Sequence, residues 1–252
     1  MSSINISVLF ISLILAHVVG DFYLQTDNYC NQKKNEKLKS WFLYVHSIVI
    51  GLLSWLIVFR WDFGLWALVI AISHFIIDAI KVHFPNGLWS FVIDQLSHVA
   101  VLWFISDIFG HHYKYTIIAC LAELYEYPAI DCVAINVELT LIILAILLSL
   151  KPANILIKLI LKKYQLGESE SCNDIKNAGA LIGNLERVLT IVFVIIGQYQ
   201  AVGFIIAAKS ILRFKDTDIA KTEYVLAGTF LSFGIAILCG LIASGPTWIE
   251  YP

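Results

Sequence analysis

Residues 63–82 read FGLWALVIAISHFIIDAIKV, and this stretch decides the fold. Apart from Ser73, His74, Asp78 and Lys81, its residues are apolar or glycine. A helix rises about 1.5 Å per residue, so about 20 such residues cross the roughly 30 Å hydrocarbon core of a membrane. The stretch therefore predicts a transmembrane helix, and it places a histidine and an aspartate inside that helix.

The rest of the chain repeats this apolar pattern. Of its 252 residues, 59% are hydrophobic and only 14% are charged, whereas soluble domains carry about 25% charged residues. The mean hydropathy is +0.80. The apolar runs predict an all-α membrane protein, a polytopic helical bundle of about eight transmembrane helices. The predicted helices cover residues 4–26, 41–60, 63–82, 88–109, 130–150, 179–198, 199–213 and 222–244.

Lysines and arginines gather in the segments on one side of these helices. Cytoplasmic loops carry an excess of Lys and Arg, so this side is expected to face the cytoplasm. Both termini are then expected outside, in a multi-pass protein of the cell (cytoplasmic) membrane. The basic side contains Lys33, Lys34, Lys37, Lys39, Lys81, Lys151, Lys158, Lys162, Lys163, Lys176, Lys209, Arg213, Lys215 and Lys221.

Three parts follow along the chain. Residues 1–110 form a four-helix half, and residues 179–252 form the C-terminal membrane helices. Between them, residues 111–178 contain interfacial segments, one transmembrane helix and a cytoplasmic loop. Within this middle part, residues 151–164 are basic and amphipathic and are expected to lie on the inner leaflet. The polar residues 167–176 are the expected loop and the boundary between the halves.

Histidines and aspartates occur four residues apart in three of the first four predicted helices. Residues at this spacing lie on one face of a helix. Gln25 extends the same face of the first helix, and His46 lies in the first turns of the second. Under the predicted topology these groups share a depth near the cytoplasmic helix ends, so they are expected to converge. The pairs are His17 and Asp21, His74 and Asp78, and Asp94 and His98.

Neutral imidazoles and carboxylates together are ligands for Zn²⁺, Mn²⁺ or Fe²⁺. The set suffices for one or two divalent transition-metal ions, with Zn²⁺ favoured and water completing the coordination. The alternative is that polar groups in the membrane only join helices by hydrogen bonds. Three pairs at one depth favour metal binding, because ionisable groups inside a membrane are costly. Asp94 is also the candidate catalytic general base. The predicted metal ligands are His17, Asp21, His46, His74, Asp78, Asp94 and His98.

Three of these stretches also carry a family resemblance. They are AHVVGDFYLQ at residues 16–25, SHFIIDAIK at 73–81 and DQLSH at 94–98. Together they resemble the signature of a bacterial integral membrane protein family, that of domain of unknown function 3307. The resemblance covers the first four predicted helices and implies no activity. In style, the His and Asp pattern is similar to membrane-bound metal-dependent hydrolases, which is an analogy between sites.

Charged residues mark the predicted cytoplasmic ends of the later helices as well. In one interpretation, Arg187, Lys209 and Arg213 hold a phosphate or carboxylate of a substrate whose reactive bond lies at the metal. In the other, these residues form a structural ion-pair network or extend to the membrane surface. The candidate substrate-binding residues are Gln25, Gln95, Glu186, Arg187, Lys209 and Arg213.

The patterns together predict a metal-dependent membrane-embedded enzyme, a hydrolase of a lipid or amphiphilic substrate at the cytoplasmic leaflet. Membrane lipids are the expected partners, and no nucleic-acid-binding feature is evident. One alternative is a proton- or cation-coupled transporter that uses the same cluster, and another is a structural or effector membrane module. A carrier needs a polar path from both sides. The outward halves of the first four helices are almost wholly apolar, which favours the enzyme.

Overall fold

The computed structural model describes residues 2–58, 61–112, 129–164, 178–213 and 219–245. These residues form helices joined by turns, with no strand among them, which confirms the all-α prediction. The chain divides into two compact units, Met1–Thr140 and Leu141–Pro252. The predicted loop at residues 167–176 and most of the predicted interfacial segment at residues 111–128 lie outside the described residues.

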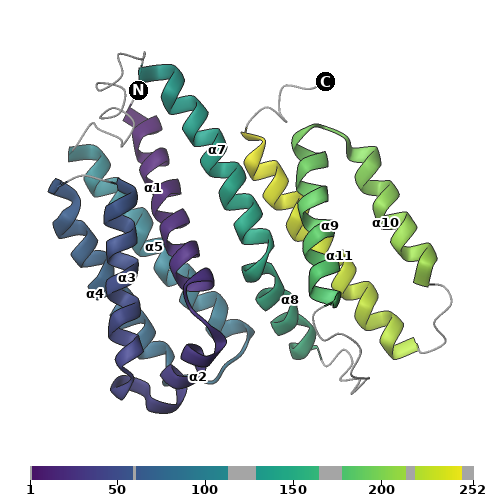
Figure 1. Ribbon diagram of the computed structural model, residues 1–252, viewed down its shortest axis with the longest axis horizontal. Coiled ribbons are helices and arrows are strands. Elements are labelled where there is room, and N and C mark those ends of the chain that lie inside the picture. Colours follow the sequence, from purple (N-terminus) through teal and green to yellow (C-terminus); the bar gives the residue numbers. More distant parts are fainter. Residues whose placement is uncertain (1, 59–60, 113–128, 165–177, 214–218, 246–252) are drawn as a thin grey trace. The chain divides into compact units, whose positions relative to one another are not determined.

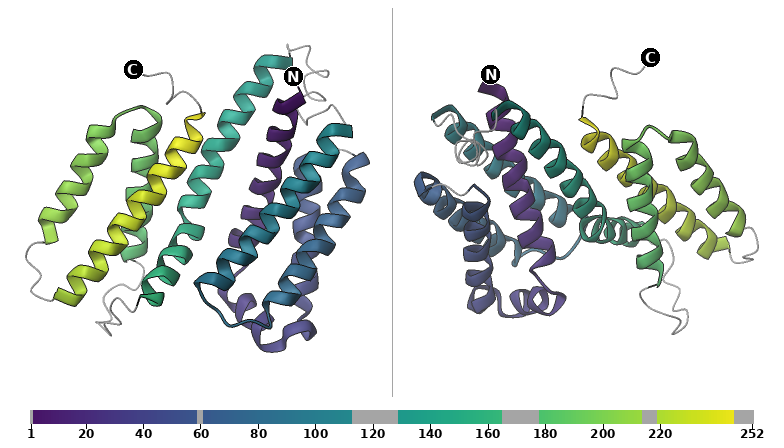
Figure 2. Two further views of the ribbon diagram at one scale, coloured as in Figure 1. Left: turned by 180° about the vertical axis from the view of Figure 1, so that it is seen from behind. Right: turned by 45° about the horizontal axis from the view of Figure 1, so that its top comes forward.

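Four helices form the bundle of the N-terminal unit (Figure 1). α1 packs against α3 and α5, and α4 packs against the same two helices, so the four close into a bundle. The view from behind in Figure 2 shows α5 alongside α1. α7 (Ala129–Ser149) begins in this unit and continues into the next. The bundle helices are α1 (Ser2–Val18), α3 (Trp41–Val58), α4 (Gly64–Lys81) and α5 (Leu88–His112).

A short polar helix crosses one end of this bundle. α1 continues into a π-helical turn, η1 (Val19–Tyr23), and the chain then enters α2 (Asp27–Glu36) and η2 (Lys37–Lys39). The stretch Asn28–Lys39 is bent by 88° from Val8–Tyr23, so α2 runs across the bundle rather than along it (Figure 1). The first and third predicted crossings end here and the second and fourth begin here. We call this end of the bundle the α2 end.

The opposite half of the bundle is packed with apolar side chains. Gly51 allows α3 to approach α4 closely, because a Cβ there would lie 2.8 Å from the Cβ of Ala71 and 2.9 Å from the carbonyl oxygen of Ala67. A second short helix, η3 (Trp61–Phe63), joins α3 and α4 at this end. The buried core of this half consists of Leu13, Ile50, Val58, Phe63, Ala67, Ile70, Leu102, Ile105 and Phe109.

The C-terminal unit contains the second part of α7 and four further helices. α9 packs against α10 and α11, and α8 packs against α11. α8 begins with Pro152 in its first turn, where proline fits a helix start, and it buries Ala153, Ile157 and Leu161. The stretch expected to lie on the membrane surface is thus a helix packed within its unit. The four are α8 (Lys151–Lys163), α9 (Ala178–Ile195), α10 (Tyr199–Arg213) and α11 (Ile219–Ala243).

In the described residues, five helical stretches are long and apolar enough to cross a membrane. A sixth is reached if Val8–Tyr23 and Asn28–Lys39 count as one bent span, and Tyr199–Ile211 is a shorter apolar helix. Helices form at all eight predicted positions, but the number of crossings and their orientation stay predictions. The five stretches are Trp41–Val58, Trp61–Lys81, Leu88–Phe109, Val137–Lys163 and Glu223–Ala243.

Candidate metal centre

All seven predicted His and Asp ligands meet at the α2 end. His17 lies in the last turn of α1, and Asp21 follows it in η1. The π-helical turn is an unpredicted feature, and such turns occur often at functional sites. Asp21 is partly buried, and the other six side chains are buried. Besides His17, the buried members of the cluster are His46 on α3, His74 and Asp78 on α4, and Asp94 and His98 on α5.

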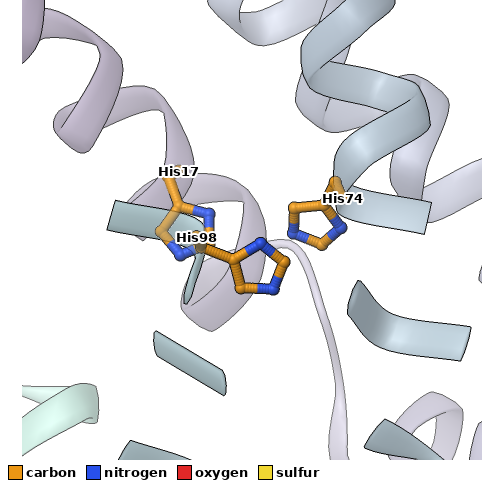
Figure 3. A group of neighbouring side chains, drawn as sticks. All are labelled: His17, His74 and His98. Carbon is orange, nitrogen blue, oxygen red and sulfur yellow. The ribbon is translucent and has the colours of Figure 1, made fainter. Parts of the chain in front are cut away.

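The histidine rings form the centre of this cluster. Figure 3 shows His17, His74 and His98 turned toward one another from three different helices. The His74 and His98 rings stack with 4.2 Å between centroids, and the His17 ring lies 4.9 Å from His98 and 5.6 Å from His74. His46 reaches the cluster from α3, with its ring 5.0 Å from that of His74.

Three overlapping groups in the cluster have the composition of a metal site. The first joins Asp21, His46 and His74, and the second joins Asp78, Asp94 and His98. The third joins the rings of His17, His74 and His98. Within each group the potential ligand atoms lie within 4.8 Å of one another. Zn²⁺ ligands at about 2.0–2.2 Å from the ion are about 3.4 Å apart in a tetrahedron, so binding requires the side chains to close by about 1 Å.

Asp21 is oriented by an imidazole and an amide. Its Oδ1 lies 3.2 Å from His46 Nε2 and 4.0 Å from His74 Nε2. Its Oδ2 accepts a hydrogen bond of 2.9 Å from Gln95 Nε2. The amide oxygen of Gln95 in turn contacts His17 Nε2 at 3.3 Å. Gln95 therefore ties the π-helical turn to α5 and fixes the orientation of His17, as polar neighbours of metal ligands do.

Two lysines complete the cluster, although the sequence analysis assigned them no role at the site beyond the positive charge of the predicted cytoplasmic side. Lys33 of α2 donates to Asp78 Oδ2 at 2.6 Å and to Gln25 Oε1 at 3.1 Å, and only 7% of its surface is exposed. Lys81 donates to Asp94 Oδ2. Gln25, predicted to bind substrate, therefore contacts the cluster through Lys33. No local pattern predicts the pair of Lys33 and Asp78, because the two residues are 45 positions apart in the sequence.

The charges of the cluster do not cancel when its four imidazoles are neutral, the form in which histidine binds a metal. Three carboxylates, on Asp21, Asp78 and Asp94, face two ammonium groups, on Lys33 and Lys81. With neutral imidazoles this leaves 3 − 2 = 1 negative charge. Asp21 is the carboxylate for which no ammonium partner is found among the described residues, because its contacts are with His46, His74 and Gln95.

Several buried atoms of the cluster have no hydrogen-bond partner among the described residues. They are both ring nitrogens of His74, Nε2 of His98 and Oδ1 of Asp94. Native proteins leave few buried polar atoms unpaired, and atoms that protein groups leave unpaired often bind an ion or a water molecule. A cavity with room for about one water molecule lies beside the rings. It is lined by His17, Ile50, Ile70, Ser73, His74, His98, Val101 and Leu102.

Three of the four candidate substrate-binding residues of the second half have described side chains, and each of the three makes a hydrogen bond inside the C-terminal unit. Lys209 donates to Glu186. Arg187 is buried and donates instead to Ser149, Asn154, Asn184 and Ser232. Arg213 is the last residue of α10, and its side chain lies outside the described part. Glu186, Arg187 and Lys209 thus have partners inside the C-terminal unit, and the choice between substrate binding and a structural role stays a prediction.

A family model matches most of the N-terminal unit. Residues 9–124 match the family described as "Protein of unknown function (DUF3307)". This confirms the resemblance found in the sequence, and the match includes all seven His and Asp residues of the cluster. No curated protein and no solved structure matches the chain.

Proposed function

Residues 9–124 belong to this family, and from the cluster they contain we propose that the protein is a metal-dependent membrane enzyme. The reaction we propose is hydrolysis of a lipid or another amphiphile near the cytoplasmic surface of the membrane. One observation carries the proposal. Four histidines and three aspartates from α1, η1, α3, α4 and α5 converge in a buried site, and several of their donor and acceptor atoms lack partners among the described residues.

The group formed by Asp21, His46 and His74 is the best place for a first ion. Its carboxylate is the one without an ammonium partner among the described residues, so a divalent cation there offsets the remaining negative charge. One carboxylate and two imidazoles are also a ligand set of catalytic zinc sites, which keep a further position for water. An ion there would supply an activated water and polarise the bond to be cleaved.

Asp94 remains the candidate general base. Its Oδ2 is engaged by Lys81 and by Gln95, whereas its buried Oδ1 has no hydrogen-bond partner in the described chain. A base must lie within hydrogen-bond reach of the proton that it takes, and this oxygen is available for that contact as long as Asp94 itself holds no metal ion. Lys81 and Gln95 would hold the carboxylate in position.

An amphiphilic substrate follows from the location of the cluster. Trp41, Tyr44 and Trp89 are exposed near the helix starts at the α2 end, and such aromatic rings favour the membrane–water interface. His46 follows Trp41 by five residues and His98 follows Trp89 by nine, which is about 8 Å and about 13 Å along a helix. The site would thus lie just below the headgroups, where a lipid can present a polar group.

The apolar half of the bundle favours the enzyme over a carrier. Beyond the histidines, the described core consists of apolar side chains. The hydroxyl groups of Ser54 and Ser106 donate to carbonyls of their own helices. A transporter needs polar groups that lead onward through the membrane. In the described part of this half the acidic residues are Asp62 in η3 and Asp107 near the end of α5, both far from the cluster along their helices.

The proposed orientation places the α2 end in the cytoplasm, because Lys33, Lys34, Lys37, Lys39 and Lys81 gather there. Both termini are then outside and all eight helices cross, as the distribution of positive charge predicts. Reporter fusions after Lys39 should read cytoplasmic, and fusions after Phe63 should read external. The opposite pair of readings would reverse the proposed side of the site.

Metal content provides the direct test. Full-length protein purified in detergent without chelator should contain at least one divalent transition metal per chain by elemental analysis. His74→Ala should lose most of it, and Ser73→Ala should keep it. The two substitutions are matched, because both residues line the same cavity, but only His74 offers ring nitrogens without protein partners. Metal-free wild-type protein, or a His74→Ala variant with full metal content, would overturn the proposal.

Turnover tests the reaction separately. Metal-loaded protein in vesicles of mixed phospholipids should release a hydrolysis product detectable by mass spectrometry. Asp94→Asn should retain the metal and lower the rate by about 10²–10⁴-fold, the usual contribution of a general base. If metal-loaded protein hydrolyses no lipid or amphiphile offered, the metal site stands and the hydrolase assignment falls.

A further inference from the structure

α2 is held to the bundle by few contacts. It is a helix of ten residues with the sequence DNYCNQKKNE, and helices this short are marginal on their own in water. Lys33 is its one fully buried side chain among those described. Beside it, the ring of Tyr29 stacks on Phe42 of α3 with 4.2 Å between centroids. The attachment of α2 therefore depends strongly on the bond from Lys33 to Asp78.

The ammonium of Lys33 lies beside a group of side chains that could bind a metal ion. Asp78, Asp94 and His98 place their ligand atoms within 4.8 Å of one another. In this group Asp94 Oδ1 and His98 Nε2 are buried and lie 3.5 Å apart, and neither has a hydrogen-bond partner in the part of the chain that the structure describes. Asp78 Oδ1 also faces His98 Nε2, at 3.8 Å. Each carboxylate thus directs one oxygen to His98 and the other to a lysine.

Charge decides whether this group can take an ion. With Lys33 and Lys81 in place, two ammonium groups balance two carboxylates, and a divalent ion would meet a neutral site that already contains two cations. If Lys33 withdraws, the group has one net negative charge, as the group around Asp21 has. Two like charges a few ångströms apart in a poorly hydrated site repel strongly, so Lys33 and an ion at Asp78 exclude one another.

We propose that Asp78, Asp94 and His98 form a second divalent-metal site, and that Lys33 of α2 closes this site as an internal counter-ion. The inference rests on the proposed metal enzyme, whose first ion lies at Asp21, His46 and His74. Entry of the second ion releases Lys33 and loosens α2 from the end of the bundle. Coupling of this kind is reciprocal, so release of α2 by another cause strengthens binding of the second ion by the same factor.

The number of bound ions tests the proposal in the full-length protein in detergent, with Zn²⁺ as the probe. At low micromolar free Zn²⁺, wild type should bind one ion per chain and Lys33→Met should bind two. Lys34→Met is the matched control, because Lys34 is the next residue of α2 and is exposed, and it should bind one. The double variant Lys33→Met/Asp78→Asn should return to one ion, since the added negative charge is removed.

A second measurement needs no substitution. In wild type, Zn²⁺ raised until a second ion binds should speed backbone hydrogen exchange in residues 28–36 by about tenfold or more, because α2 loses its buried attachment. Exchange in α4 and α5 should be unchanged or slower. If Lys33→Met fails to fold, this experiment still decides the question.

The outcomes separate the two proposals. Wild type that binds no Zn²⁺ overturns the metal enzyme and this inference with it. Wild type that binds one ion, with Lys33→Met also binding one, leaves the enzyme standing and overturns the second site. Wild type that binds two ions without any change of exchange in α2 overturns the role of Lys33.

Discussion

The two units of the chain each bury a group of polar side chains, and these groups differ in how completely their hydrogen bonds are satisfied. In the N-terminal cluster, His74, Asp94 and His98 have buried atoms for which the described residues provide no hydrogen-bond partner. In the C-terminal unit, Arg187 is 2% exposed and all three of its guanidinium nitrogens donate. No described side chain of this second unit has a buried nitrogen or oxygen without a partner.

The partners of Arg187 explain what the satisfied group does. Its Nε donates to the carbonyl of Ser149 at the end of α7, where helical carbonyls lack partners of their own. Its Nη1 donates to Ser232 of α11 at 2.8 Å, and its Nη2 donates at 2.6 Å to Asn154 of α8 and at 2.6 Å to Asn184 of α9. One side chain therefore connects four helices.

The contrast teaches how to separate structural from functional polar groups inside a membrane bundle. Both groups were candidates for function from sequence, because ionisable residues are rare in such helices. A network whose donors and acceptors are all paired has no obvious need of a ligand. A cluster with unpaired buried atoms and a remaining negative charge does need a ligand, because burying unpaired polar atoms and uncompensated charge costs free energy.

Replacing Arg187 should produce the largest change in stability. Arg187→Met leaves the Ser149 carbonyl, Ser232 and Asn154 Oδ1 without the donor they share, whereas Asn184 Oδ1 keeps a donor in Asn154. We expect this to lower the free energy of unfolding by about 3–5 kcal/mol. Denaturation in detergent with a fluorescence readout measures this. The metal content of the remaining folded protein should equal that of wild type. A stable variant that loses only metal or activity would break the comparison and return Arg187 to the substrate-binding interpretation.

The pair of Glu186 and Lys209 should show an intermediate effect. Their side chains are 16% and 20% exposed and are bonded to each other, so removing either partner leaves a partly buried charge. We expect Lys209→Met and Glu186→Gln each to lower stability by about 1–2 kcal/mol, and the double variant to recover most of that loss. Single variants that differ widely in stability, with activity lost only in Lys209→Met, would favour substrate binding by Lys209.

Apolar patterns predicted the helices well because a membrane helix needs a continuous run of about 20 apolar residues. The runs at residues 41–60, 63–82 and 88–109 correspond to α3, α4 and α5 with small shifts at their ends. The spacing of four within His74 and Asp78, and within Asp94 and His98, correctly indicated a shared face. Shared depth then indicated convergence, although the role of these residues as metal ligands stays a prediction.

Contacts that depend on chain folding could not be predicted in the same way. Lys33 reaches Asp78 because α2 folds back across the bundle, and no periodic pattern carries that information. Arg187 finds Asn154 and Ser232 at separations of 33 and 45 residues. The π-helical turn at Asp21 has no sequence signal of its own here. Each of these features changes the charge or the hydrogen bonding of one of the two polar groups. The chemistry of these groups was therefore harder to predict than the positions of the helices.

The smallest expected effect tests how rigidly the Arg187 network is held, through the glycine one turn before it. A Cβ on Gly183 would lie 3.3 Å from Nη1 of Arg187. A free arginine end would move aside easily, but this one is fixed by its bonds to four helices. Gly203 of α10 is the matched control, because it is exposed and a Cβ there meets no atom within 4 Å.

Alanine at these two glycines should change stability in opposite directions. Gly203→Ala should stabilise by up to about 1 kcal/mol, since alanine favours a helix interior over glycine. Gly183→Ala gains the same propensity but displaces the guanidinium, so we expect a net loss of about 1 kcal/mol. In an Arg187→Met background the displaced group is gone, and Gly183→Ala should then stabilise as Gly203→Ala does. Thermal unfolding of the four variants in one detergent measures the difference. If Gly183→Ala stabilises the otherwise unchanged protein, the guanidinium moves freely. The hydrogen bonds of Arg187 would then not hold it in place, and the contrast between its satisfied network and the unsatisfied cluster of the other unit would lose its basis.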